Sequence, residues 1–228
     1  MPNEFDNANR RNGQWARSAA CLLISSAMIT LAGCSLFVMG GQMLLGRPMI
    51  PASFDEFTKK SLKDDGVTAI VICEAPMGSD SETAALDQEL QTEVTRRLKQ
   101  HDIKVIDSHK VATWMDDNGG DWGGPAELFE KFKNADFLIL VDVNEFSYLE
   151  KNSPDLYRGR SQIEVSVYEN DEFDARIYTN EIDAVYPQRY PAMADRINQS
   201  AFRKRFVDHL SDQIARLFYE HRPEEAFD

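Results

Sequence analysis

Cysteine is scarce in this chain: three occur among 228 residues, and their placement excludes a fold held by disulfides. Cys21 and Cys34 lie in an apolar amino-terminal segment, so Cys73 stands alone in the remainder. A lone cysteine has no internal partner, and the domain must therefore be held together by its hydrophobic core. Because Cys73 follows alternating apolar residues of a predicted strand, we expect an inert buried thiol.

Positive charge is also scarce. Lys and Arg number 25 against 38 Asp and Glu, which gives a net charge of −13. Such a chain repels phosphate backbones and anionic head groups, which excludes nucleic acid as a partner and excludes membrane attachment through a basic patch. Any membrane attachment must come from the apolar amino terminus.

Residues that carry out catalysis or bind metals are few. Asp107-Ser108-His109 contains the residue types of a catalytic triad, but neighbours in sequence cannot face one another as nucleophile, base and orienting group. A strand end followed by a helix N-cap at Ser108 is the better explanation. No two histidines are spaced as a metal-binding pair, and we expect all of them at helix ends or on helix surfaces. We therefore expect no cofactor. We also expect no metal ion bound by the histidines, which are His101, His109, His209 and His221.

The acidic loop from Asp116 to Asp121 is the best candidate for cation binding. Asp116, Asn118 and Glu127 match positions one, three and twelve of a calcium-binding loop. However, Gly120 and Asp121 occupy the positions that require an oxygen ligand and a turn glycine. We expect an ordinary acidic loop, with cation binding left open.

One long apolar run is present near the amino terminus. Ser18 to Gly46 contains no charged residue, and it follows the positive charges of Arg10, Arg11 and Arg17. Within it, Leu31-Ala32-Gly33-Cys34 resembles the lipobox of bacterial lipoprotein precursors, in which small residues precede a cysteine that becomes lipidated. This resemblance implies cleavage before Cys34, recognition of Leu31, Ala32 and Gly33 by the signal peptidase, and an acyl chain such as palmitate on Cys34.

An uncleaved transmembrane helix is the alternative interpretation of the same run, since it exceeds the roughly 20 residues that span a bilayer. Both interpretations place the carboxy-terminal domain in the periplasm or another extracytoplasmic space, because the positive charges precede the apolar residues. The choice between inner and outer membrane stays open. The predicted division is a signal peptide over 1–33, a lipidated tether over 34–66, a domain over 67–222 and a tail over 223–228.

The domain shows alternating helical and strand periodicity. Leu86, Leu90, Val94 and Leu98 recur every fourth residue and predict one amphipathic helix. The full order of predicted elements is β-α-β-α-α-β-β-β-α, which indicates an α/β domain of two or three layers around a mixed β-sheet. The predicted ranges are strand 67–74, helix 79–100, strand 104–107, helices from 108 and over 125–133, strands 136–141, 163–168 and 173–186, and helix 199–221.

A known group of envelope proteins is similar to this pattern. It comprises the amino-terminal domain of the Tol translocation propeller protein, the lipoprotein activators of penicillin-binding proteins and the curli-secretion lipoprotein. The resemblance covers roughly residues 67 to 221 and implies an α/β fold and a place in the cell envelope. It is carried by the opening strand Val67 to Cys73, Arg96-Arg97-Leu98-Lys99 at a helix end, Lys104 to Asp107, Ala135 to Leu140, the meander and the closing helix.

Aromatic residues and arginines are interleaved between the predicted strands. Phe146, Tyr148 and Tyr157 accompany Arg158 and Arg160, and such residues are frequent anchors of protein interfaces. They form the candidate partner surface, which the segment from Tyr186 to Tyr190 could extend. An ordinary strand pair whose aromatic rings pack on the sheet is the alternative.

The expected function is that of a non-enzymatic, lipid-anchored adaptor or assembly factor with an envelope protein as its partner. An envelope hydrolase is one alternative, and it requires carboxylates such as Asp107, Asp116 and Glu145 to meet in one pocket. A module that binds cell wall or a small ligand is the other, and an apolar cleft with a few converging polar groups would favour it.

Overall fold

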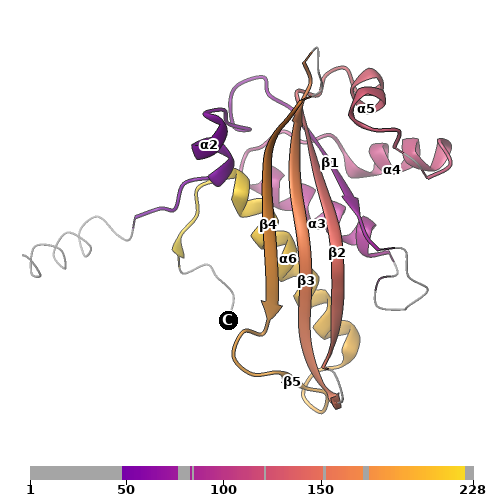
Figure 1. Cartoon of the computed structure of the whole chain (residues 1–228), viewed down its shortest axis with the longest axis vertical. Coiled ribbons are helices and arrows are strands. Elements are labelled where there is room, and N and C mark those ends of the chain that lie inside the picture. The colour runs from indigo at the N-terminus through magenta and orange to yellow at the C-terminus, as the bar shows by residue number, and fades with distance from the viewer. Residues whose placement is uncertain are drawn as a thin grey trace, which may run out of the picture. The chain divides into compact units, whose positions relative to one another are not determined.

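A mixed β-sheet organises the chain (Figure 1). Its strands are β1 (Ala69–Glu74), β2 (Phe137–Glu150), β3 (Ser153–Glu169), β4 (Arg176–Tyr186) and the short β5 (Ala192–Met193). The strand order is β1-β2-β3-β4, with β1 parallel to β2, the other pairs antiparallel, and β5 paired with the start of β3. The computed structural model describes residues 48–76, 83, 85–120, 122–150, 153–171 and 175–223. The predicted α/β class and mixed sheet are confirmed.

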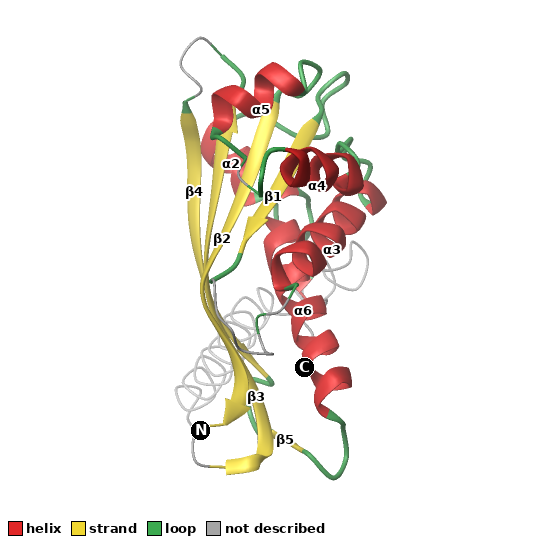
Figure 2. Ribbon diagram, turned by 90° about the vertical axis from the view of Figure 1, so that its right-hand side faces the viewer, coloured by secondary structure: helices red, strands yellow, loops and turns green. Residues whose placement is uncertain are grey.

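Helices cover the sheet in layers. Figure 2 shows α3 and α6 along one face of the sheet, where the larger part of the core lies. A second, smaller core joins the opposite face of β1 and β2 to α4 and α5. The helices are α2 (Ser53–Thr58), α3 (Leu86–Gln100), α4 (Ser108–Asp117), α5 (Pro125–Lys131) and α6 (Gln199–Ala215), which continues into a 3-10 helix (Arg216–Phe218).

The periodicities of the sequence explain these layers. The predicted stripe Leu86, Leu90, Val94 and Leu98 is fully buried, so α3 presents one apolar face to the sheet. In β1 the alternate residues point into the two cores, which explains why the whole strand is apolar. Cys73 lies in the larger core and is 4% exposed, and its burial raises the pKa of the thiol, as expected of an inert side chain.

Two local predictions are corrected. The predicted strand 104–107 is a single parallel bridge between Val105 and Ala69, because the chain turns into α4 directly after Asp107. Asp107, and not Ser108, is the N-cap: its carboxylate accepts a hydrogen bond of 2.9 Å from the backbone N–H of His109. The predicted helix start at residues 79–82 lies outside the described residues, and α3 begins at Leu86.

The amino-terminal boundary of the domain is also corrected. The sequence assigns residues 34–66 to a tether, yet Phe54 is 0% exposed and Leu62 is 1% exposed within the larger core. The backbone of Ile50 further exchanges hydrogen bonds of 2.8 and 3.0 Å with that of His221. The compact unit therefore begins at Met49 and includes α2. Its first segment is too short to show a periodicity, and for this reason its burial was not predicted.

Cys34 and the apolar run Ser18 to Gly46 lie outside the described residues. Within the part of the chain that the structure describes, no helix has the length and apolar character that crossing a membrane requires.

Candidate functional site

The aromatic members of the predicted partner surface lie inside the core. Phe146, Tyr148 and Tyr157 are 8%, 2% and 8% exposed, and their rings contact Phe202 and Phe206 of α6. This part of the predicted surface was wrong, because a buried ring cannot contact a partner. The packing of aromatic rings on the sheet, which was the alternative interpretation, is what the structure shows.

A β-bulge in β2 explains the burial of two of these rings. The register of β2 against β3 shifts between Val143 and Glu145, so one extra residue enters β2. Odd-numbered residues up to Val143 point into the larger core, and after the bulge the even-numbered Phe146 and Tyr148 do so. Sequence alternation alone cannot place an insertion of this kind.

Arg158 and Arg160 remain on the opposite face of β3. Between them lies Gly159, where an added Cβ would come within 2.5 Å of the Phe206 ring. Arg158 Nη2 donates to the carbonyl of Arg189 at 3.0 Å, and Arg160 Nη2 lies 3.2 Å from a carboxylate oxygen of Glu150. These contacts link the start of β3 to the end of β2 and to the loop after β4.

Exposed apolar side chains gather at the same end of the sheet. Leu149, Val185, Tyr190 and Met193 are 42%, 38%, 81% and 49% exposed. Val185 is paired with Arg160 in the register of β3 and β4, and Met193 is paired with Leu156. An exposed apolar group rimmed by polar residues is typical of an interaction site. We call the following residues the tip surface: Leu149, Arg158, Arg160, Val185, Tyr190 and Met193.

Charged side chains of both signs surround the tip surface. Arg189 and Arg196 lie beside it, and within the described residues neither side chain takes part in an ion pair. The carboxylates at this end include Glu150, Asp155 and Asp195, and Asp183 lies two residues before Val185 on β4. The arginines that form no ion pair within the described residues can each pair with an acidic group of a partner.

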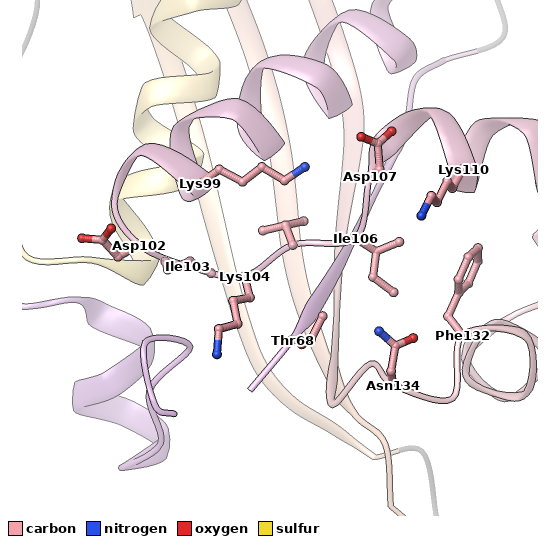
Figure 3. Close-up of a pocket in the computed structure, with 11 residues that line it drawn as sticks. Thr68, Lys99, Asp102, Ile103, Lys104, Ile106, Asp107, Lys110, Phe132 and Asn134 are labelled. Atoms are coloured by element: carbon pink, nitrogen blue, oxygen red, sulfur yellow. The ribbon is translucent and has the colours of Figure 1, made fainter. Parts of the chain in front are cut away.

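A groove lies at the β1 edge of the sheet, where the chain that follows α3 forms the bridge between Val105 and Ala69. Its volume is about 640 Å³, and Figure 3 shows Lys99, Asp107, Lys110 and Asn134 around Ile106. The groove is polar and open, whereas the ligand-binding alternative requires an apolar cleft with a few converging polar groups. Asp107 is already engaged as the N-cap of α4.

The carboxylates of the hydrolase alternative do not meet. Asp107 and Asp116 lie at opposite ends of α4. Val105 and Phe137 both pair with Ala69, and Glu145 follows eight residues further along β2. At about 3.3 Å per residue this places Glu145 about 26 Å beyond the level of Val105, and Asp107 follows only two residues after Val105. These three residues therefore form no common pocket.

The acidic loop is divided between two helices. Asp116 belongs to α4, Asn118 is its C-cap, and Glu127 lies in the first turn of α5. Asp121 lies outside the described residues. Nowhere in the described ranges do three or more His, Cys, Asp or Glu residues lie close enough to hold a metal ion.

His209 differs from its prediction. It is 5% exposed within α6, not solvated at a helix end, and its two ring nitrogens have no hydrogen-bond partner in the described part of the chain. Its ring centroid lies 5.0 Å from that of Tyr186 on β4. Burial lowers the pKa of His209, and the positive charge of Arg216 lowers it further, which favours the neutral imidazole. His101, by contrast, is the C-cap of α3, as expected of a histidine at a helix end.

No protein-family model matches the chain, and no curated protein matches its sequence. Among solved structures it is similar to lipoprotein GNA1162 from Neisseria meningitidis, with 13% identity, a TM-score of 0.43, and coverage of 65% of this chain and 98% of that one. It is also similar to a PelC dodecamer from Paraburkholderia phytofirmans, with 12% identity, a TM-score of 0.43, and coverage of 70% of this chain and 93% of that one. A third similar structure is the hypothetical protein CT253 from Chlamydia trachomatis, with 16% identity, a TM-score of 0.42, and coverage of 68% of this chain and 98% of that one. Similarities this low say nothing about the activity or partners of the chain.

Proposed function

We propose that the protein is a non-enzymatic adaptor of the bacterial envelope, anchored by a lipid on Cys34, that binds an envelope protein through its tip surface. The observation that carries this proposal is the separation of the two ends of the domain. The chain enters beside α2, whose Phe57 ring centroid lies 5.8 Å from that of Tyr178 near the start of β4. The tip surface lies at the other end of β4, beside β5 (Figure 1).

This separation suits an anchored adaptor. Tyr178 and Tyr186 are eight residues apart on one strand, which spans about 26 Å at roughly 3.3 Å per residue. A lipid attached ahead of α2 would leave the opposite end of the sheet free to contact a partner. The rigid strands between them would hold that end away from the point where the chain enters the domain.

The composition of the tip surface favours a protein partner. Tyrosine, arginine and methionine are enriched in interfaces, and a few such residues provide most of the binding energy. Tyr190 is the most exposed large apolar side chain in the described residues, at 81%. The neighbouring arginines favour a partner surface with both apolar and acidic residues.

Tyr190→Ala is expected to weaken binding of the partner about tenfold or more, because truncation of an interface tyrosine commonly costs 1–2 kcal/mol or above. The partner is first captured in the native host by a photoreactive amino acid at position 190 and identified by mass spectrometry. The matched control is Thr179, which is exposed on β4 near the end opposite to the tip surface. Equal capture from both positions, or unchanged affinity of Tyr190→Ala, would contradict docking at the tip surface.

Cys34→Ala is expected to abolish both lipidation and membrane retention. Intact mass and membrane partitioning are measured for both forms purified from the native host. The wild-type chain should begin at Cys34 and carry added acyl mass. An unprocessed chain that stays in the membrane in both forms would instead identify the apolar run as a transmembrane helix, consistent with its length.

A further inference from the structure

Seven large apolar side chains are exposed within the described residues, and they fall into two groups at opposite ends of the domain. Four of them belong to the tip surface. The other three are Met49, Ile50 and Phe57, which are 46%, 41% and 72% exposed. They lie within nine consecutive residues, at the place where the chain enters the domain beside α2 (Figure 1). We call these three residues the entry patch.

The entry patch is fixed to the body of the domain. The backbone of Ile50 pairs with that of His221 through hydrogen bonds of 2.8 and 3.0 Å. Phe57 belongs to α2, whose Phe54 is completely buried, and the Phe57 ring centroid lies 5.8 Å from that of Tyr178 on β4. The surface that covers the patch therefore also determines the direction in which β4 points.

The patch is too small to hold a protein partner by itself. A stable protein interface buries about 800 Å² on each partner, whereas three partly exposed side chains offer on the order of 300 Å². A weak contact of this size is effective only where the opposing surface is already held close, because tethering gives that surface a high effective concentration. For a chain attached through a lipid on Cys34, the surface held close is the membrane.

The chain that leads into the patch favours the same surface. Thirteen residues, 35–47, separate Cys34 from the first described residue, Pro48. Seven of these residues are large and apolar and one is charged, a composition that suits the boundary between head groups and acyl chains. The chain thus reaches Met49 from a segment with affinity for lipid.

The charges beside the patch indicate which lipids it suits. Residues 55–60 carry two carboxylates, Asp55 and Glu56, and two lysines, Lys59 and Lys60, and so have no net charge. Anionic head groups gain no electrostatic advantage there, and the contact must come from the burial of apolar area. The surface that fits the patch is therefore a bilayer of zwitterionic lipid.

We propose that the entry patch docks on the lipid surface of the membrane that holds the chain, with Met49, Ile50 and Phe57 buried among the head groups. This inference rests on the proposed membrane attachment and adds an orientation to it. β4 then runs away from the bilayer. The tip surface, about 26 Å further along this strand at roughly 3.3 Å per residue, faces away from the lipid and toward a partner.

Methionine provides a matched pair of probes, because Met49 in the entry patch and Met193 in the tip surface are 46% and 49% exposed. The chain purified from the native host, labelled with ¹³C in its methionine methyl groups, is reconstituted in phosphatidylcholine nanodiscs that contain lipids with gadolinium on the head group. Paramagnetic broadening falls steeply with distance, so a separation of about 26 Å should leave Met193 broadened about tenfold less than Met49. Phosphatidylglycerol added to the nanodiscs should not change this ratio.

Tethering alone also keeps Met49 near the membrane, and two paired substitutions separate tethering from docking. Ile50→Ser combined with Phe57→Ser leaves the tether intact but should lower the ratio severalfold, because the domain then turns freely. Val185→Ser combined with Tyr190→Ser removes two exposed apolar side chains from the tip surface and should leave the ratio unchanged.

The methyl signal of Met115, which packs against the smaller core, reports that each variant is folded. Similar broadening of Met49 and Met193 in the wild-type chain, or a wild-type ratio after substitution of the entry patch, would overturn the proposal. A Met49 chemical shift that depends on protein concentration would overturn it as well and would assign the patch to a second copy of the chain. The intact mass of the same sample reports separately on the lipid at Cys34, so failure of the anchor and failure of docking are distinguished.

Discussion

Phe54→Ala is expected to lower the free energy of unfolding by about 3–5 kcal/mol, the usual cost of removing a buried phenylalanine ring. Phe54 is completely buried, and its ring lies 5.9 Å from Phe137, 5.5 Å from Tyr178 and 5.6 Å from Phe218, measured between centroids. These neighbours belong to β2, β4 and the 3-10 helix. The substitution would therefore open a cavity where three parts of the domain meet.

Phe57→Ala is the matched control, because Phe57 lies in the same short helix but is 72% exposed. Its substitution is expected to change the free energy of unfolding by less than about 1 kcal/mol. Urea unfolding of each purified chain, followed by circular dichroism, measures both effects. Small and equal effects would show that the segment 49–66 is only a tether, as the sequence alone had indicated.

The elements with strong periodicity could be predicted from sequence. In α3 a four-residue spacing of leucine and valine recurs over three turns, and burial of this stripe is the main source of helix stability. β1 is apolar throughout because it is covered on both faces. Such patterns arise when one face of a whole element, or both faces, are buried. A single sequence is therefore enough to detect them.

Features that depend on one residue or on distant contacts could not be predicted in this way. α2 has six residues, too few for a period, and its burial depends on β4 and the 3-10 helix far along the chain. The bulge after Val143 reverses which residues of β2 face the core, and no composition marks it. The burial of His209 likewise depends on β4, which packs beside α6.

Only part of the tip surface could be predicted from the sequence. Arg158 and Arg160 alternate with buried residues, so their exposure follows from strand geometry. Leu149, Val185 and Met193 are exposed because, within the described residues, no helix covers the face of the sheet opposite α6 at that end, and this is a property of the assembled fold. The arginines thus belong both to the predicted partner surface and to the tip surface, while the apolar part of the tip surface required the structure.

Arg97→Ala is expected to lower the free energy of unfolding by roughly 3 kcal/mol, because it removes one member of a buried charge cluster between α3 and α6. Arg97 Nη1 lies 3.0 Å from Asp212 Oδ1, and its Nη2 lies 3.0 Å from Asp208 Oδ1. Its Nε further donates to the hydroxyl of Ser211 at 3.1 Å. The side chains of Arg97 and Asp212 are only 13% and 8% exposed, so water cannot replace the lost contacts.

The adjacent Arg96 provides the control, since its side chain is 45% exposed and pairs with Glu93 on the helix surface at 2.6 Å. Exposed pairs contribute about 0–1 kcal/mol, so Arg96→Ala is expected to be nearly neutral in the same urea titrations. Asp212 also pairs with Arg216 at 2.7 Å, which limits the loss in Arg97→Ala because the carboxylate keeps one cation. Combining Arg97→Ala with Asp212→Asn should then cost less than the sum of the two single changes, because the carboxylate that Arg97 neutralises is absent. Additive effects would show instead that Arg97 stabilises the domain through the packing of its side chain and not through charge.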